Sequence, residues 1–431
     1  IVFDATDDFL TLGSDYNFKT TGGWTVESLV YYNSVAGGYN NTTSPANFIG
    51  SEDINYNSWY WSVLENKLAL WNISPGYWRY GSTTLQPNTW YHVILTCSDD
   101  GTTYRFYLNG VPENGDHVTQ SWNPSYSGLR IRYFGKGNNG NPRLVNGKIN
   151  ITKVYNRALP QSEIAKNALQ YKTKYSLTIK DGSTSELAAP SATHLKNLGI
   201  SKDGNYWIQP EGQTAFQAPV KFHLNKAMVC VMKGGNGSGY VPDSSYWENT
   251  TLDNSSDFTL TNGVSSKYQS YNVVPFTEFY WTMGELNYQS TFSLASEVSS
   301  MYTAQTRSWN NSANRSTPHF GNSIDYRSLV GADRRYTSAL GTEIYLMGMD
   351  LKHEGHYGGG GGSSGGRIRV GSILDESTGN TAGEAYGNAG SAFGIGVNGG
   401  NPLKTGVCGY AGWTEPSIIG GTDNWSLWVV F

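Results

Sequence analysis

The stretch from Trp90 to Gly110 decides the fold of this chain, and it reads WYHVILTCSDDGTTYRFYLNG. Two runs of alternating, β-favouring residues flank a polar turn, as expected for strands with one buried face. Asp100-Gly101 is the dipeptide that favours a hairpin turn, and Asn109-Gly110 opens a second tight turn. The stretch therefore predicts an antiparallel hairpin.

The pattern of this hairpin, a Trp-hydrophobic-His-Val strand followed by a strand that ends in Leu-Asn-Gly, resembles the laminin-G-like (concanavalin A-like) β-sandwich. Two more segments resemble that family in the same order: VFDATDDFLTL from Val2 to Leu12 and GKINITKVYNRAL from Gly147 to Leu159. A short helix is predicted with Pro160 at its first position and with one face formed by Ile164, Ala168 and Leu169. The resemblance covers residues 1–172 and implies an antiparallel jelly roll of a kind that often binds sugars.

Composition limits the other possibilities. The chain has 431 residues, too many for one ordinary core, so two or three domains are expected. Charged residues make up only 15%, and the net charge is −4 with a sequence pI of about 6.0, so no nucleic-acid partner is expected. No apolar run approaches the ~18 residues of a membrane-spanning helix, and with three distant cysteines we expect no disulfide framework, although one bridge stays open.

A second domain is predicted for residues 195–431, after a turn-rich linker at 173–194. Its opening, DGNYWIQPEG from Asp203 to Gly212, resembles the entry of fibrinogen-like domains, although the disulfide cysteines of that family are missing. Farther on, an acidic and histidine-rich segment precedes five glycines, Gly358 to Gly362, and the chain ends in an apolar strand. This order resembles the intelectins, the calcium-dependent lectins of the fibrinogen-like group. The whole chain is thus expected to be mainly β, with a sandwich followed by an α+β fibrinogen-like domain.

The segment before the glycine run carries the candidate metal ligands. Ca²⁺ takes six to eight oxygen ligands, and the glycines would let backbone carbonyls turn inward. The predicted calcium ligands are Asp350, His353, Glu354, His356, Asp375 and Glu376. Two histidines could instead hold Zn²⁺, and a polar surface loop without a metal is the third reading. The proposed role is that of a lectin ion that binds vicinal sugar hydroxyls.

Aromatic side chains give further candidates for ligand contact, because their faces stack on pyranose rings. In the second domain these are Tyr386, Tyr410 and Trp413. In the sandwich, alternation within Trp59-Tyr60-Trp61 places the two tryptophans on one face and the tyrosine on the other, so that one face is core and the other is a possible sugar platform. An acidic turn near the N-terminus is either a structural calcium site or solvated; it contains Asp4, Asp7 and Asp8.

No catalytic motif stands out. The Glu-x-Asp-x-x-Glu strand of jelly-roll glucanases is missing from the sequence, and the adjacent side chains of Glu52-Asp53 point to opposite faces of a strand, unlike a glycosidase pair. We therefore expect no enzyme but a glycan-binding surface protein. By analogy, the protein is expected to resemble adhesins on phage virions, such as tail fibres or capsid decoration proteins. Its expected location is the virion surface or otherwise extracellular.

The partners expected with this role are cell-surface or environmental glycans, other virion proteins and further copies of the chain, without membrane insertion. The alternatives are a secreted calcium-dependent lectin of a cell and a purely structural virion protein. A glycosidase is disfavoured because the carboxylate motif is missing.

Overall fold

The computed structural model describes residues 1–4, 6–17, 22–34, 46–50, 59–72, 77–101, 103–113, 130–137, 144–235, 244–261, 264–283, 288–306, 336–337, 343–354, 367–375, 391–399, 404–411 and 424–431. They form two compact units. The first comprises residues 1–181 with 197–200, and the second comprises 182–196 with 201–431. Each unit is described by itself.

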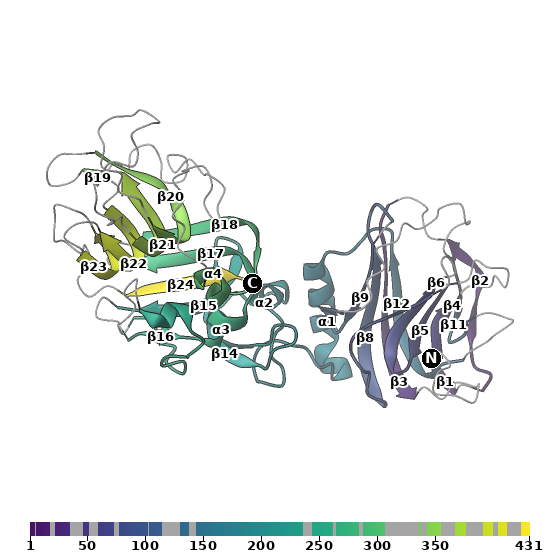
Figure 1. The fold of residues 1–431 in the computed structure, drawn as a ribbon. Helices are drawn as coiled ribbons and strands as arrows, with labels where there is room; N and C mark the ends of the chain where they lie inside the picture. Colours follow the sequence, from purple (N-terminus) through teal and green to yellow (C-terminus); the bar gives the residue numbers. More distant parts are fainter. Residues whose placement is uncertain are drawn as a thin grey trace. The chain divides into compact units, whose positions relative to one another are not determined.

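The first unit is a sandwich of two six-stranded antiparallel sheets (Figure 1). One sheet has the order β1 (Val2–Asp4), β12 (Asn146–Tyr155), β3 (Trp24–Ser34), β8 (Thr89–Cys97), β9 (Tyr104–Leu108) and β10 (Val111–Pro112). The other has the order β2 (Leu10–Asn17), β11 (Arg130–Phe134), β4 (Ala46–Gly50), β5 (Trp59–Leu64), β6 (Lys67–Asn72) and β7 (Tyr77–Tyr80). The predicted hairpin is confirmed as β8 and β9, paired from Val93–Leu108 to Cys97–Tyr104.

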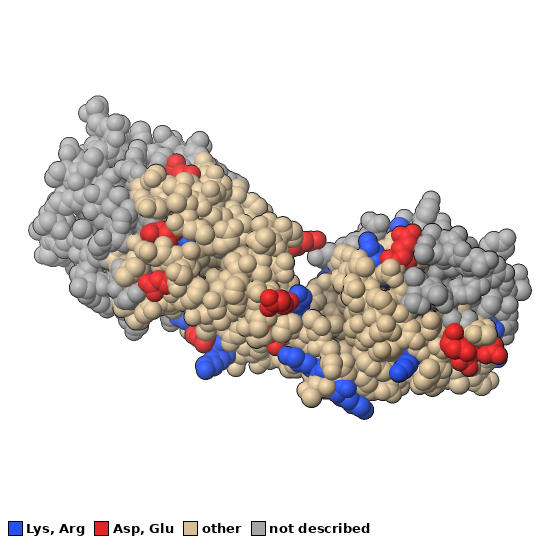
Figure 2. Space-filling model, turned by 90° about the horizontal axis from the view of Figure 1, so that it is seen from below, with Lys and Arg blue, Asp and Glu red and all other residues tan. Residues whose placement is uncertain are grey.

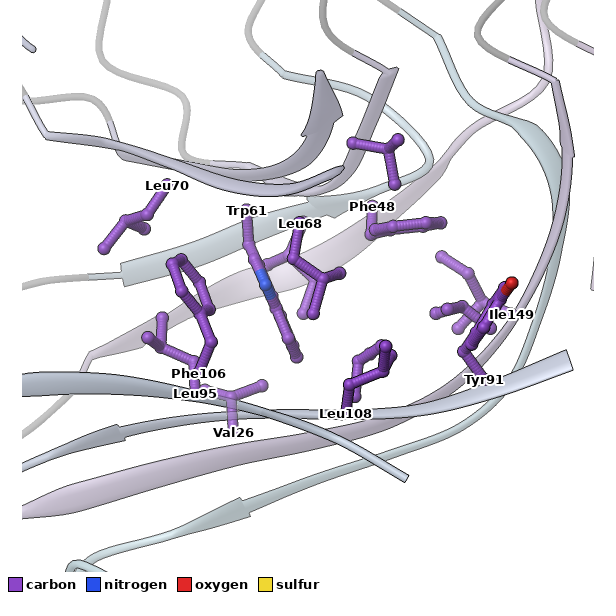
Figure 3. Close-up of a cluster of buried hydrophobic side chains, with 14 of the residues drawn as sticks. Val26, Phe48, Trp61, Leu68, Leu70, Tyr91, Leu95, Phe106, Leu108 and Ile149 are labelled. Carbon is purple, nitrogen blue, oxygen red and sulfur yellow. The ribbon is translucent and has the colours of Figure 1, made fainter. Parts of the chain in front are cut away.

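The core of the sandwich lies between the two sheets. Trp61 of β5 is fully buried, and Figure 3 shows its ring reaching toward Val26, Leu95 and Phe106 of the opposite sheet. Tyr60, its neighbour, is not part of this cluster. The predicted alternation is therefore confirmed for Tyr60 and Trp61.

Helix α1 (Gln161–Tyr175) packs on the outer face of the first sheet, and Pro160 is its N-cap rather than its predicted first residue. Ile164 is buried against Ile94 of β8, and Ala165 and Ala168 are also buried. A Cβ at Gly110, which has φ +85°, would lie 3.1 Å from the Ala165 Cα, so the turn after β9 needs glycine to let the helix approach. The predicted helix face was wrong at one position, since Leu169 is 40% exposed.

The second unit contains two antiparallel sheets. The larger has seven strands in the order β13 (Gly204–Ile208), β14 (Phe216–His223), β15 (Lys226–Gly234), β24 (Trp425–Val430), β17 (Phe276–Met283) and β18 (Tyr288–Val298), with β16 (Ser266–Lys267) paired to β15. The smaller has β19 (Tyr336–Thr337), β20 (Glu343–Glu354), β21 (Arg367–Asp375), β22 (Ser391–Gly399) and β23 (Lys404–Ala411). The helices are α2 (Ala192–Asn197), the 3₁₀ helix η1 (Ser245–Glu248), α3 (Gln269–Val273) and α4 (Met301–Gln305).

The final strand β24 lies in the middle of the larger sheet, between β15 and β17 (Figure 1). Its apolar residues are buried, and one cluster joins them to α3 and α4. The mainly β fold with antiparallel sheets is confirmed, whereas the likeness of residues 195–431 to fibrinogen-like domains stays a prediction. No helix within the described ranges is long and apolar enough to span a membrane.

The two units meet in sequence at residues 181 and 182, inside the predicted linker 173–194. Most of that segment is packed rather than exposed. Leu177 and Ile179 are buried with the sandwich helix, and Ala188 and Ala189 are buried in the second unit. The sandwich unit therefore extends past the predicted end at residue 172.

Candidate functional site

The predicted calcium ligands are spread along one strand pair of the second unit. Asp350, His353 and Glu354 lie in β20, and Asp375 is the last residue of β21. Asp375 pairs with Tyr345, eight residues along β20 from His353, which is about 26 Å at ~3.3 Å per residue. The side chains of Asp350, His353, Glu354 and Asp375 lie outside the described part of the structure, so calcium binding by these residues stays a prediction.

The remaining predicted ligands of the second unit are only partly within the described residues. His356 and Glu376 lie outside them, as do Tyr386 and Trp413. Tyr410 lies in β23, where it pairs with Phe393 of β22. Calcium binding at Asp350, His353 and Glu354, and ligand contact by the aromatic residues, stay predictions.

A different group of carboxylates does come together, at one end of the sandwich. The turn between β1 and β2 brings carboxylate oxygens of three exposed residues within 4.8 Å of one another: Asp4, Asp7 and Asp8. Among the side chains that the structure describes, this is the one group of three or more His, Cys, Asp or Glu residues close enough to hold a metal ion. The acidic turn singled out in the sequence thus has the geometry of a possible cation site.

The backbone holds this turn in shape. The Thr6 amide donates to Asp4 Oδ1 at 2.8 Å, and the Asp4 amide donates to Asp8 Oδ2 at 3.2 Å. The first of these hydrogen bonds is the main cause that lowers the pKa of the Asp4 carboxyl below its ordinary value. The carboxylate is therefore ionised at neutral pH and available to a cation.

An aromatic and cationic group lies beside the acidic turn. Phe9 follows Asp8 directly, is 45% exposed, and meets the Tyr133 ring edge-on at 6.1 Å. The Lys136 ammonium lies 4.0 Å from the Phe9 ring centroid and 4.9 Å from that of Tyr133. We call these residues together the rim cluster: Asp4, Asp7, Asp8, Phe9, Tyr133 and Lys136.

Strand pairing fixes the position of the rim cluster. Leu10, the first residue of β2, pairs with Phe134, the last of β11, so Phe9 and Lys136 flank one end of this strand pair. Gly135, with φ +81°, makes the turn into Lys136, and a Cβ there would collide with the Phe3 ring at 2.5 Å. The cluster thus offers exposed carboxylates and an exposed ring beside the buried Lys136 at a loop end of the sandwich, a combination suited to polar ligands with an apolar face.

The described Lys and Arg side chains do not cluster as the three carboxylates of the rim cluster do. On the face drawn in Figure 2, described Lys and Arg side chains are distributed over both units rather than collected into one stripe. A stripe or patch of basic residues is the usual electrostatic footprint of a nucleic-acid site. The rim cluster, with three carboxylates and one ammonium, instead carries a net negative charge.

A second polar group lies between the first sheet and α1, and sequence reasoning did not find it. The Glu27 carboxylate accepts from Tyr155 Oη at 2.7 Å and Asn167 Nδ2 at 3.0 Å, and lies 3.2 Å from His92 Nε2. The ammonium of Lys153 lies 3.5 Å from Glu27 and donates to Tyr171 Oη at 2.8 Å. We call this set the Glu27 network: Glu27, His92, Lys153, Tyr155, Asn167 and Tyr171.

The centre of the Glu27 network is buried, since Glu27 is 1% and His92 0% exposed, whereas the Lys153 side chain is 41% exposed. Burial by itself would raise the pKa of the Glu27 carboxyl, but the hydrogen bonds from His92 and Tyr155 and the charge of Lys153 outweigh it, so this pKa lies below its ordinary value. The Glu27 carboxylate of β3 thus joins α1 to β8 and β12 and fixes the helix on the sheet. Its one sequence signal was His92, within the motif that carried the family resemblance.

Comparison with known proteins agrees with this fold. Residues 4–165 match the family model described as the concanavalin A-like lectin/glucanases superfamily. The N-terminal unit is therefore a concanavalin A-like domain, of the laminin-G type expected from the sequence. A search of curated proteins gives no match.

Several solved structures are similar to part of this chain at low identity. The SAP-like pentraxin of Limulus polyphemus is 15% identical, with 39% of this chain and 80% of the pentraxin covered and a TM-score of 0.31. A candidate carbohydrate-binding protein of Bacteroides ovatus is 18% identical, with 39% and 44% covered and a TM-score of 0.27. The sialidase of Trypanosoma rangeli is 18% identical, with 34% and 23% covered and a TM-score of 0.24. The chain thus spans less than half of the latter two proteins, and TM-scores of this size say nothing about function.

Proposed function

We propose that this protein binds glycans without cleaving them, and that the rim cluster of the N-terminal unit takes part in that binding. The observation that carries the proposal is the match of residues 4–165 to a lectin and glucanase superfamily. Because one fold hosts many functions, the site has to be argued from its residues. The rim cluster is where the described part of this domain combines exposed carboxylates with an exposed aromatic ring.

The chemistry of the rim cluster suits a sugar in two ways. A Ca²⁺ ion held by Asp4, Asp7 and Asp8 would complete its shell of six to eight oxygens with water or sugar hydroxyls. The exposed face of Phe9 would pack against the C–H face of a pyranose. Calcium at this turn is part of the proposal, and so is the absence of hydrolysis.

The biological setting that we propose rests on the analogy to phage adhesins drawn from the sequence. Attachment to host or environmental glycans from a virion surface, in a complex with other virion proteins or copies of the chain, remains our proposal for the biological setting. Its alternatives are a secreted lectin and a structural virion protein. Retention of a glycan by the purified chain supports the first two and opposes the third.

Two variants test the rim cluster on a printed array of neutral and acidic glycans. Asp7→Asn removes one carboxylate without breaking the Asp4 and Asp8 hydrogen bonds, and Phe9→Ala removes the ring. Each is expected to weaken retention about tenfold or more, the effect of one lost charge-assisted contact or stacked ring. Calcium titration calorimetry on the unmutated chain should show binding that Asp7→Asn weakens.

Glu211→Gln is the matched control, since it removes one exposed carboxylate from the second unit. It should leave both calcium affinity and glycan retention unchanged. Equal losses in Glu211→Gln and Asp7→Asn would mean that only overall charge matters. Full glycan retention in both Asp7→Asn and Phe9→Ala would show that the rim cluster does not bind glycans.

A further inference from the structure

The larger sheet of the second unit has two unlike faces. One face packs against α3 and α4 through Phe279, Trp281 and Val429. The alternate residues of the same strands, Tyr280 and Trp428, belong to a separate cluster with Met228, Cys230 and Tyr268. Side chains alternate between the faces of a strand, so this second cluster lies on the face opposite α3 and α4.

Two basic side chains of β14 extend over that second face. Lys221 pairs in register with Met228, and His223 is two residues farther along the same strand, so the two share a face. The Lys221 ammonium lies 5.6 Å from the Trp428 ring and 5.8 Å from the Tyr280 ring. The His223 ring lies 5.6 Å from that of Tyr280. Lys221 and His223 thus both lie near the aromatic rings of this face of the sheet.

Among the residues that the structure describes, neither basic group has an acidic partner. The nearby Glu278 carboxylate is taken by Lys226 and by Ser293, whose hydroxyl donates at 3.0 Å. Within the described ranges, no carboxylate or other hydrogen-bond acceptor meets the Lys221 ammonium, and the buried Nε2 of His223 has no hydrogen-bond partner. A buried polar atom without a partner costs free energy, which a ligand that hydrogen-bonds to it would recover.

We propose that Lys221 and His223 form a binding site for an oxyanion, the carboxylate or sulfate ester of an acidic glycan. An oxyanion can accept from the ammonium and from the imidazole at once, in charge-assisted hydrogen bonds. The sugar ring itself is not what this site recognises, because Tyr280 and Trp428 are each only 1% exposed and offer no free face for stacking. The site lies in the second unit and does not depend on the rim cluster.

Titration calorimetry of the full chain with three probes tests this site: a sulfated disaccharide, its desulfated counterpart and inorganic sulfate. The sulfated disaccharide is expected to bind at least about tenfold more tightly than the desulfated one, as for one charge-assisted pair. Lys221→Gln and His223→Gln should each remove most of that difference. Lys202→Gln removes an exposed lysine of the same unit as the matched control and should preserve it.

Thermal unfolding of each variant shows that it is folded before it is compared. Equal affinity for the two disaccharides in the unmutated chain overturns the proposal, as does a loss in Lys202→Gln that equals the loss in Lys221→Gln. Inorganic sulfate should bind to the same site, because the oxyanion and not the sugar ring is recognised, and sulfate binding that Lys221→Gln leaves unchanged would overturn the proposal. Loss of neutral-glycan retention in the rim variants is a separate result, because the comparison of sulfated with desulfated probe isolates the second site.

Discussion

The substitution Glu27→Ala is expected to lower the free energy of unfolding of the N-terminal unit by about 3–5 kcal/mol, the usual cost of breaking a buried charged network. Removal of the carboxylate leaves the donors of Tyr155 and Asn167 without their acceptor. It also leaves the Lys153 ammonium without its nearest charge partner. Hydrogen exchange followed by mass spectrometry on β3 and β8 peptides measures this loss locally.

The same substitution at Glu163 is the matched control. Glu163 pairs with Arg157 at 2.8 Å, but both side chains are more than a third exposed, at 36% and 51%. Surface pairs of this kind contribute about 0–1 kcal/mol. If Glu27→Ala costs no more than Glu163→Ala, the Glu27 network does not hold α1 in place.

Low pH should reduce the stability that the Glu27 network contributes. Because the pKa of folded Glu27 lies below its unfolded value of about 4.3, its stabilisation is complete above that unfolded value. It is lost as the pH falls through the folded value. Glu27→Gln should therefore weaken the acid dependence of exchange in β3, and an unchanged dependence would contradict this assignment.

The substitution Trp61→Ala is the second large effect, with an expected loss of about 3–5 kcal/mol from the N-terminal unit. Trp61 is fully buried between the sheets, where its ring reaches the residues of β3, β8 and β9 (Figure 3). Alanine would leave a cavity that the paired strands on both sides of β5 cannot close. Denaturant unfolding of the full chain, with exchange at β5 and β6 peptides, measures the loss.

The indole nitrogen allows a sharper control. Trp61 Nε1 has no hydrogen-bond partner among the described residues, so Trp61→Phe removes volume without breaking a hydrogen bond and should cost only about 1–2 kcal/mol. Phe9→Ala, at a 45% exposed position, should cost less still. A Trp61→Phe loss as large as that of Trp61→Ala would contradict this account, because the volume that phenylalanine keeps would then contribute nothing to stability.

The sandwich could be predicted from sequence because its signals are local. The hairpin of β8 and β9 is set by alternation and by the Asp100-Gly101 turn, and the start of α1 by Pro160. The acidic turn Asp4–Asp8 was also visible, since its three carboxylates lie within five residues. In each case the residues that decide the structure are neighbours in the chain.

The remaining features could not be predicted because they are assembled from distant strands. The Glu27 network joins residues 27, 92, 153, 155, 167 and 171, and the rim cluster needs Lys136 beside Phe9. The insertion of β24 between β15 and β17 depends on pairing across almost 200 residues. The placement of the predicted calcium ligands also depends on strand register, which pairs Asp375 with Tyr345, eight residues along β20 from His353.

The central claim is that this protein retains glycans and leaves them intact. The most direct test incubates the full chain with an equimolar glycan mixture and calcium, separates bound from free glycans by ultrafiltration, and records the masses of both fractions. We expect one or a few glycans to be enriched in the protein-bound fraction, with their masses unchanged. No enrichment of any glycan, or the appearance of smaller fragments, would contradict it.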